Sequence, residues 1–410
     1  MQNIIFLFFF FLLEACSGTQ KINSIVDFTT ILMPNSKKEI TLSETLEDDN
    51  FGNHFVYVSN GYIQKINDIT NFEVKKLPFG SDSFSAMPFV RGGKLYAAFK
   101  NGNVKCFDLA SQKTDWVVKI DNINKSIVTS TLVASNDYVI VTYNTSLYKI
   151  SAQTGNILNK YSLPDLVKQY PVIRGDKLYI KTANNNLYAY DLNSLRELWN
   201  YKTWSEYIST NSDKAPVIIG NQLISGFTTG QIISFESETG REFWQIDILK
   251  QAKTKLGSEP ADFTCQPAIF GQYLYVATSG SIVKIDARIP LEEWSVEASD
   301  IISMTTAGDL FVINNRGQIA AISHEDGSVI WATNLLEAQK SRTYSPAIFT
   351  PPLVTRSKIF AFSDEGYGYA IDTQNGEVVK KFSIPKNIKS FCISAGKIIL
   401  FNNKGAYILN

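Results

Sequence analysis

The strongest constraint on the fold is an internal repeat in which a small turn residue, an acidic residue and a tryptophan recur at fixed spacing. The pattern is Gly, five residues, Asp, seven residues, Trp, as at Gly102, Asp108 and Trp116. Further copies end at Trp199, Trp244, Trp294 and Trp331, and degenerate copies lie at 145–159 and 366–380. The central acidic or polar positions lie 37 to 50 residues apart. A period of this size built only from strands is typical of a β-propeller.

Each copy contains short runs rich in β-branched and aromatic residues. Residues 94–99, for example, precede the turn pair Asn101-Gly102. Such runs predict strands joined by tight turns, because Gly and Asn tolerate positive φ. A second turn of the Thr-Gly type, as at Thr154-Gly155, precedes the fourth run. We therefore expect an all-β fold, an eight-bladed β-propeller of four-stranded antiparallel blades. Nine hairpin units are visible, so the additional hairpin at 55–67 should cap the closing blade or form a ninth blade.

The five repeat tryptophans are expected to be structural. An indole can fill the gap between adjacent blades while its N–H reaches a backbone carbonyl. Sugar or quinone binding by these tryptophans is the weaker reading, because a binding residue would not recur in nearly every blade. Trp204 lies outside the repeat and is expected to be more exposed.

The N-terminus has the pattern of a secretory signal peptide. Residues 4–13 are ten consecutive apolar residues, too few to span a hydrocarbon core of roughly 30 Å. The following Leu13-Glu14-Ala15-Cys16 resembles the lipobox of bacterial lipoproteins, with Cys16 as the acylated residue. We expect a signal peptide at 1–15, a lipidated polar tether at 16–50 and the propeller at 51–410. Ser17, where an inner-membrane retention signal would place Asp, indicates the outer membrane by resemblance to the enterobacterial sorting rule.

Composition argues against several function classes. The chain has 39 basic and 39 acidic side chains, so it has no net charge to hold nucleic acid. Its only histidines, His54 and His324, lie far apart. Cys106, Cys265 and Cys392 are widely spaced and are expected to be buried small hydrophobes, with one long-range disulfide as the alternative. No common catalytic motif occurs. We expect no catalytic residue, metal or cofactor.

The repeat, with Leu-Tyr before the glycine and Thr-Gly before the tryptophan, is similar to that of pyrroloquinoline-quinone-type propellers. Together with the lipobox and the length, the chain resembles the BamB family, lipoprotein subunits of the outer-membrane β-barrel assembly (BAM) machinery. The resemblance runs in register over about 72–410. Residues 397–407 are similar to the family's C-terminal hairpin, which implies ring closure against an N-terminal strand, here 72–79.

The resemblance also implies a partner, the periplasmic POTRA repeats of BamA, bound through two loops at about 204–214 and 249–264. At the family's Leu-x-Leu-Arg stretch and Asp-x-Asp motif, and beside them, the candidate contact residues are Trp204, Tyr207, Ile208, Thr210, Asn211, Asp262, Phe263 and Thr264. Exposed aromatics among these would be the natural anchors. The family's arginine is absent, and Asp262 has a second reading as a turn-forming residue.

Two other functions compete with this reading. A lipid-anchored periplasmic propeller could bind a glycan or another protein, since fold alone does not define function. Quinoprotein dehydrogenases share the repeat, but by resemblance they require Ca²⁺, a quinone pocket and adjacent cysteines, whereas no two cysteines here are closer than 90 residues. Unfolded outer-membrane proteins are a further expected partner, because an unpaired outer strand at the closing blade could pair with an extended client.

Overall fold

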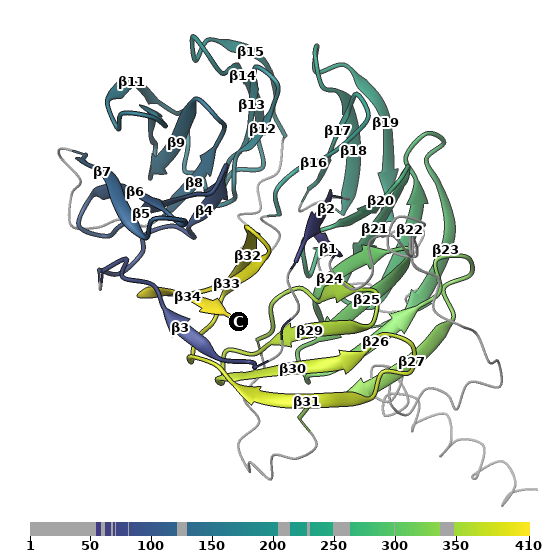
Figure 1. Cartoon of the computed structure of the whole chain (residues 1–410). Coiled ribbons are helices and arrows are strands. Elements are labelled where there is room, and N and C mark those ends of the chain that lie inside the picture. Colours follow the sequence, from purple (N-terminus) through teal and green to yellow (C-terminus); the bar gives the residue numbers. More distant parts are fainter. Residues whose placement is uncertain are drawn as a thin grey trace, which may run out of the picture.

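The structure is a computed structural model, shown in Figure 1. It describes residues 55–58, 62–66, 69, 71–80, 82–120, 129–203, 214–227, 230–248, 263–298, 300–336 and 348–410. Within these ranges the chain forms 34 strands in eight antiparallel sheets. The sheets surround a central axis as the blades of a propeller (Figure 1), which confirms the predicted fold class. The described residues include no helix with the length and apolar character needed to cross a membrane.

The first seven blades each contain four consecutive strands. Blade one contains β4 (Phe89–Arg91), β5 (Lys94–Ala98), β6 (Asn103–Asp108) and β7 (Lys113–Lys119). Blade two contains β8 (Ser130–Ala134), β9 (Tyr138–Tyr143), β10 (Ser146–Ser151) and β11 (Ile157–Ser162). Blade three contains β12 (Val172–Arg174), β13 (Lys177–Lys181), β14 (Leu187–Asp191) and β15 (Glu197–Tyr201).

The next four blades continue this order around the axis. Blade four contains β16 (Val217–Ile219), β17 (Gln222–Gly226), β18 (Gln231–Glu236) and β19 (Glu242–Asp247). Blade five contains β20 (Ala268–Phe270), β21 (Tyr273–Ala277), β22 (Ser281–Asp286) and β23 (Leu291–Glu297). Blade six contains β24 (Ile301–Ala307), β25 (Asp309–Asn314), β26 (Gln318–Ile322) and β27 (Val329–Asn334). Blade seven contains β28 (Leu353–Thr355), β29 (Lys358–Phe362), β30 (Tyr367–Asp372) and β31 (Val378–Ser383).

Blade eight closes the ring with strands from both ends of the described chain. It contains β32 (Ser390–Ser394), β33 (Lys397–Asn402), β34 (Gly405–Leu409) and, on its outer side, β3 (Val74–Lys76). Val74 pairs with Leu409, and the Asn410 amide donates to the Glu73 carbonyl at 2.9 Å. This confirms the predicted closure of the ring by a strand within 72–79.

The additional hairpin forms neither a ninth blade nor a cap on the closing blade. Its strands, β1 (Phe55–Val58) and β2 (Tyr62–Lys65), join blade seven through pairing of β1 with β28. They lie on the axial side of that blade (Figure 1). The two alternatives predicted from the sequence are therefore wrong, because β28 offers an unpaired inner edge that the hairpin count could not reveal.

Alternation along each strand builds the core between neighbouring blades. In β6, Val104 and Cys106 pack toward blade two, whereas Phe107 packs toward blade eight. The outermost strands are exposed on one side, as in β7, where Trp116 is buried between exposed neighbours. Side chains two residues apart point to the same face of a strand. Each blade therefore buries both of its faces, one against each neighbour.

Four antiparallel strands return the chain to the side from which it entered. All connections between blades thus lie on one face of the propeller, together with the turns between second and third strands; we call this the loop face. The opposite face carries the remaining turns within blades, and we call it the turn face. The predicted partner loops connect blades three and four and blades four and five. The described residues that flank both loops lie on the loop face.

Candidate partner-binding face

The repeat tryptophans lie at the junctions between blades. Trp116, Trp199, Trp294 and Trp331 are buried, and Trp244 is half-buried. Each indole N–H donates to a backbone carbonyl of the following blade at 2.8 to 3.1 Å, namely that of Ala152, Ser237, Ala287, His324 or Thr373. This geometry satisfies the one polar group of a buried indole. The tryptophans thus hold the blades together, as the repeat predicts.

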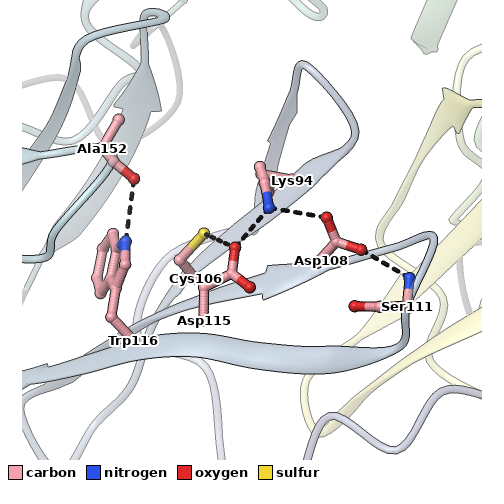
Figure 2. A network of polar contacts seen from close by, with 7 residues as sticks. All are labelled: Lys94, Cys106, Asp108, Ser111, Asp115, Trp116 and Ala152. Atoms are coloured by element: carbon pink, nitrogen blue, oxygen red, sulfur yellow. Dashed lines mark hydrogen bonds and ion pairs between the residues drawn. The ribbon is translucent and has the colours of Figure 1, made fainter.

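The repeat acids shape the turns on the turn face. Asp108 accepts the Ser111 amide at 2.6 Å and the Lys94 ammonium at 2.7 Å, and Lys94 also contacts Asp115 at 2.6 Å (Figure 2). The bond from Lys94 holds the pKa of Asp108 well below its usual range. The two carboxylates in turn raise the pKa of Lys94. These groups satisfy one another, so this cluster is a structural one.

The stems of the two predicted partner loops lie on the loop face. Trp204, Tyr207, Ile208, Thr210, Asn211 and Asp262 fall outside the described residues, so their roles stay predictions. The first loop leaves blade three at Thr203, whose amide is fixed by the Asn186 side chain at 3.1 Å. The second leaves blade four at Ile248, whose amide donates to the Gly230 carbonyl at 3.0 Å. Both loops therefore start from anchored backbone.

The far stems of the two loops are joined by one side chain. Gln266 donates its amide N–H to the Ala215 carbonyl at 2.9 Å and accepts the Ala215 N–H at 3.1 Å. This pair of bonds links the end of the first loop to the end of the second across 51 residues of sequence. Sequence reasoning missed Gln266, because it lies outside the repeat frame and a lone glutamine gives no signal of a distant partner. The far stems of the two candidate loops are thus held together.

Phe263 does not serve as an exposed anchor, which corrects the prediction made for it. The side chain is 5% exposed and packs in a cluster with Val217, Ile224 and Ile269. Its ring lies directly over Gly226, where any Cβ would overlap it. The ring is buried because Gly226 leaves a space of its size between blades four and five. It therefore stabilises the second loop stem rather than offering a free surface.

Thr264 and Cys265 continue this stem. The Thr264 amide donates to the Ala277 carbonyl at 2.9 Å, and the side chain is half-buried. A contact role for Thr264 stays a prediction. Burial raises the pKa of the Cys265 thiol to about 12, so the thiol is protonated at neutral pH and unreactive. Like Cys106 and Cys392, Cys265 is free of any disulfide.

The described residues contain no group of three or more His, Cys, Asp or Glu side chains placed to hold a metal ion.

His324 lies in a turn of blade six, and its ring is hydrogen-bonded to the Tyr275 hydroxyl. Burial lowers the pKa of His324 to about 4, so its ring is neutral at physiological pH. The backbone carbonyl of His324 accepts hydrogen bonds from the Trp294 indole N–H and from the Lys284 ammonium. His324 therefore belongs to a blade junction.

Fold and repeat together define the class of pyrroloquinoline-quinone-like eight-bladed propellers. The sequence matches the family described as "Outer membrane protein assembly factor BamB" over residues 100–333 and 295–409, and the chain belongs to this family. An uncharacterized protein of Rickettsia conorii is 25% identical and covers 97% of this chain and 96% of its own length. Outer membrane protein assembly factor BamB of Shewanella oneidensis is 23% identical over 72% of this chain and 76% of its own. BamB from Moraxella catarrhalis has a similar crystal structure, with a TM-score of 0.67 and 16% identity over 83% of this chain and 99% of its own.

Proposed function

We propose that this protein is a non-catalytic scaffold subunit of the β-barrel assembly machinery of the outer membrane, and that it binds the POTRA repeats of BamA. Family membership supports this role. The observation that carries the proposal is the clamp between Gln266 and Ala215, which brings the stems of both candidate loops together on the loop face. Rigid blades would then present the loops as one docking surface.

The expected mechanism is positioning rather than chemistry. A propeller whose blades are joined by indole–carbonyl bonds changes shape little on binding. Such a rigid body can hold a flexible multi-repeat arm in one pose, because the ordering cost falls on the arm alone. A docking surface of ordinary size buries about 1,600 Å² in total. The joined stems of the two loops mark the part of the loop face where such a surface is proposed.

Membrane attachment through Cys16 completes the proposal. Cys16 lies outside the described residues. Acylation with several chains would anchor the protein stably, where a single chain gives only marginal binding. The proposed location is the periplasmic face of the outer membrane. Replacement of Cys16 by Ser should release the protein into the soluble fraction, and unchanged membrane association would contradict the anchor.

The docking proposal is tested by binding of residues 20–410 to the POTRA repeats of BamA from the same organism. Wild type is expected to bind with micromolar affinity or better, and Ile208→Asp and Asp262→Arg should each weaken binding at least tenfold. Gln153→Arg, an exposed residue on the turn face, is the matched control and should bind like wild type. Failure of the wild type to bind would favour a propeller that recognises a glycan or another protein.

A further inference from the structure

The axial edge of β28 is paired with β1, a strand from outside its blade. Val56 lies opposite Thr355, and Tyr57 lies opposite Val354. In the described part of the chain, the first strands of the other seven blades carry no strand on this side. Blade seven therefore has a strand-accepting edge that faces the axis, and the chain fills it with its own hairpin.

The attachment of the hairpin to this edge is short. Two residue pairs join β1 to β28, whereas four join β1 to β2 within the hairpin. The accepting edge cannot extend toward the loop face, because Pro351 and Pro352 precede β28 and have no N–H to donate. Strand β1 also lies in contact with β24 of blade six. The hairpin is thus paired more extensively within itself than with blade seven.

The following segment keeps the hairpin near this edge. Ile66, which is 2% exposed, forms a parallel bridge with Gly396 in blade eight and packs against Leu353 and Leu400. Linkage of this kind holds a neighbouring segment at a high local concentration, of the order of millimolar. Occupancy of the β28 edge then depends on the chain linkage as well as on the two residue pairs. Segments with few such contacts open without global unfolding.

We propose that the axial edge of β28 is a binding site for an extended polypeptide strand, with the hairpin β1–β2 as its built-in occupant, which an extended segment of a client displaces. Recognition would be by main-chain hydrogen bonds, the mode in which a peptide adds a strand to an open sheet edge. The identity of the client as an unfolded outer-membrane protein rests on the proposed function. The strand-accepting edge itself does not.

The test compares one full-length protein in two redox states. Val56→Cys and Thr355→Cys are introduced together, so that oxidation ties β1 to β28 and reduction frees it. The control carries Val58→Cys and Tyr62→Cys, a pair opposed within the hairpin, which oxidation closes without tying it to blade seven. A fluorescent synthetic peptide with the sequence of residues 55–65 is the probe, and its anisotropy reports binding. Circular dichroism confirms that each form is folded.

Saturable binding to the reduced protein is expected, with at least tenfold weaker binding after oxidation of the 56/355 pair. Oxidation of the control pair should change the affinity less than twofold. Tyr57→Pro, which removes an N–H from β1, should raise the affinity at least threefold, because it weakens the occupant and leaves β28 intact. Equal binding in both redox states of the 56/355 pair would overturn the proposal. So would the absence of saturable binding to both the reduced protein and Tyr57→Pro. None of these outcomes depends on binding to BamA.

Discussion

The ring of Trp199 lies so close to Gly240 that a Cβ at this glycine would be 2.6 Å from the indole Cδ2. Gly240 is in a turn of blade four, adjacent to the blade that carries Trp199, and has a φ of +74°. The same relation joins Trp116 to Gly155, as well as Trp294 to Gly327 and Trp331 to Gly376. Glycine is therefore required here for both space and backbone conformation.

Gly240→Ala should destabilise the protein by about 2–4 kcal/mol, since it adds overpacking against a buried indole to the cost of positive φ. Gly220→Ala is the matched control, because Gly220 has a φ of +59° and no atom within 4 Å of the added Cβ. The control should lose only about 1 kcal/mol. Chemical denaturation of the two variants measures the difference. Equal losses of unfolding free energy in the two variants would show that the indole moves aside at no energetic cost.

The junction between blades two and three replaces both members of this pair. Asn159 stands where five other blades have tryptophan, and Leu195, with a φ of +56°, stands where four other blades have glycine. Leu195 packs with Ile140 and Leu147 of blade two and fills the space of the missing indole. Lys149 donates to the Asn193 carbonyl at 2.6 Å, so a lysine side chain provides a hydrogen bond from blade two to blade three.

This exchange predicts strong coupling between positions 159 and 195. Asn159→Trp alone should destabilise the protein by about 1–3 kcal/mol, because the indole meets Leu195. Leu195→Gly alone should cost about 2–4 kcal/mol, because it leaves a cavity. The double variant should be more stable than the sum of the two losses implies, by at least about 1 kcal/mol. Additive losses in a denaturation cycle would contradict the replacement of one pair by the other.

The repeat allowed much of this architecture to be predicted. Spacing of Gly, Asp and Trp defined the blade, since each of these residues has a local physical task that the sequence displays. Pairing of β1 with β28 could not be predicted, because main-chain bonds between distant strands leave no mark on side-chain patterns. The burial of Phe263 was missed for a related reason. The Phe263 ring fits between the blades only because residue 226 is a glycine. Gly226 belongs to blade four and Phe263 precedes blade five, so the sequence does not show that they meet.

Buried tyrosines predict a loss of stability in alkali. Burial raises the pKa of Tyr96, Tyr143 and Tyr369 to about 12 from 10. Because the folded pKa is the higher one, this contribution is complete below pH 10 and is lost as pH rises toward 12. A shift of this size corresponds to about 2–3 kcal/mol for the well-buried Tyr143. Unfolding free energy measured from pH 8 to 12 should therefore fall above pH 10.

Tyr143→Phe is the control for this prediction. The variant loses the bond from the hydroxyl to the Phe99 carbonyl, which is 3.2 Å long. It should therefore be less stable than wild type at pH 8, and the difference should narrow between pH 10 and 12. Phenolate absorbance of the folded wild type should rise late for the buried rings. Full ionisation of all tyrosines near pH 10 without unfolding would contradict their burial.

The clamp between Gln266 and Ala215 predicts an effect on partner binding larger than its effect on stability. Gln266 is exposed, so Gln266→Ala should cost less than about 1 kcal/mol of unfolding free energy. Affinity for the POTRA repeats of BamA should nevertheless fall about three- to tenfold, because the stems of the two loops are no longer held together and must be ordered on binding. Gln266→Glu can still accept the Ala215 amide but cannot donate to its carbonyl, and should lie between Ala and wild type. Isothermal titration alongside thermal melts separates the two effects. Unchanged affinity in Gln266→Ala, with Ile208→Asp still impaired, would show that each loop binds independently of the other.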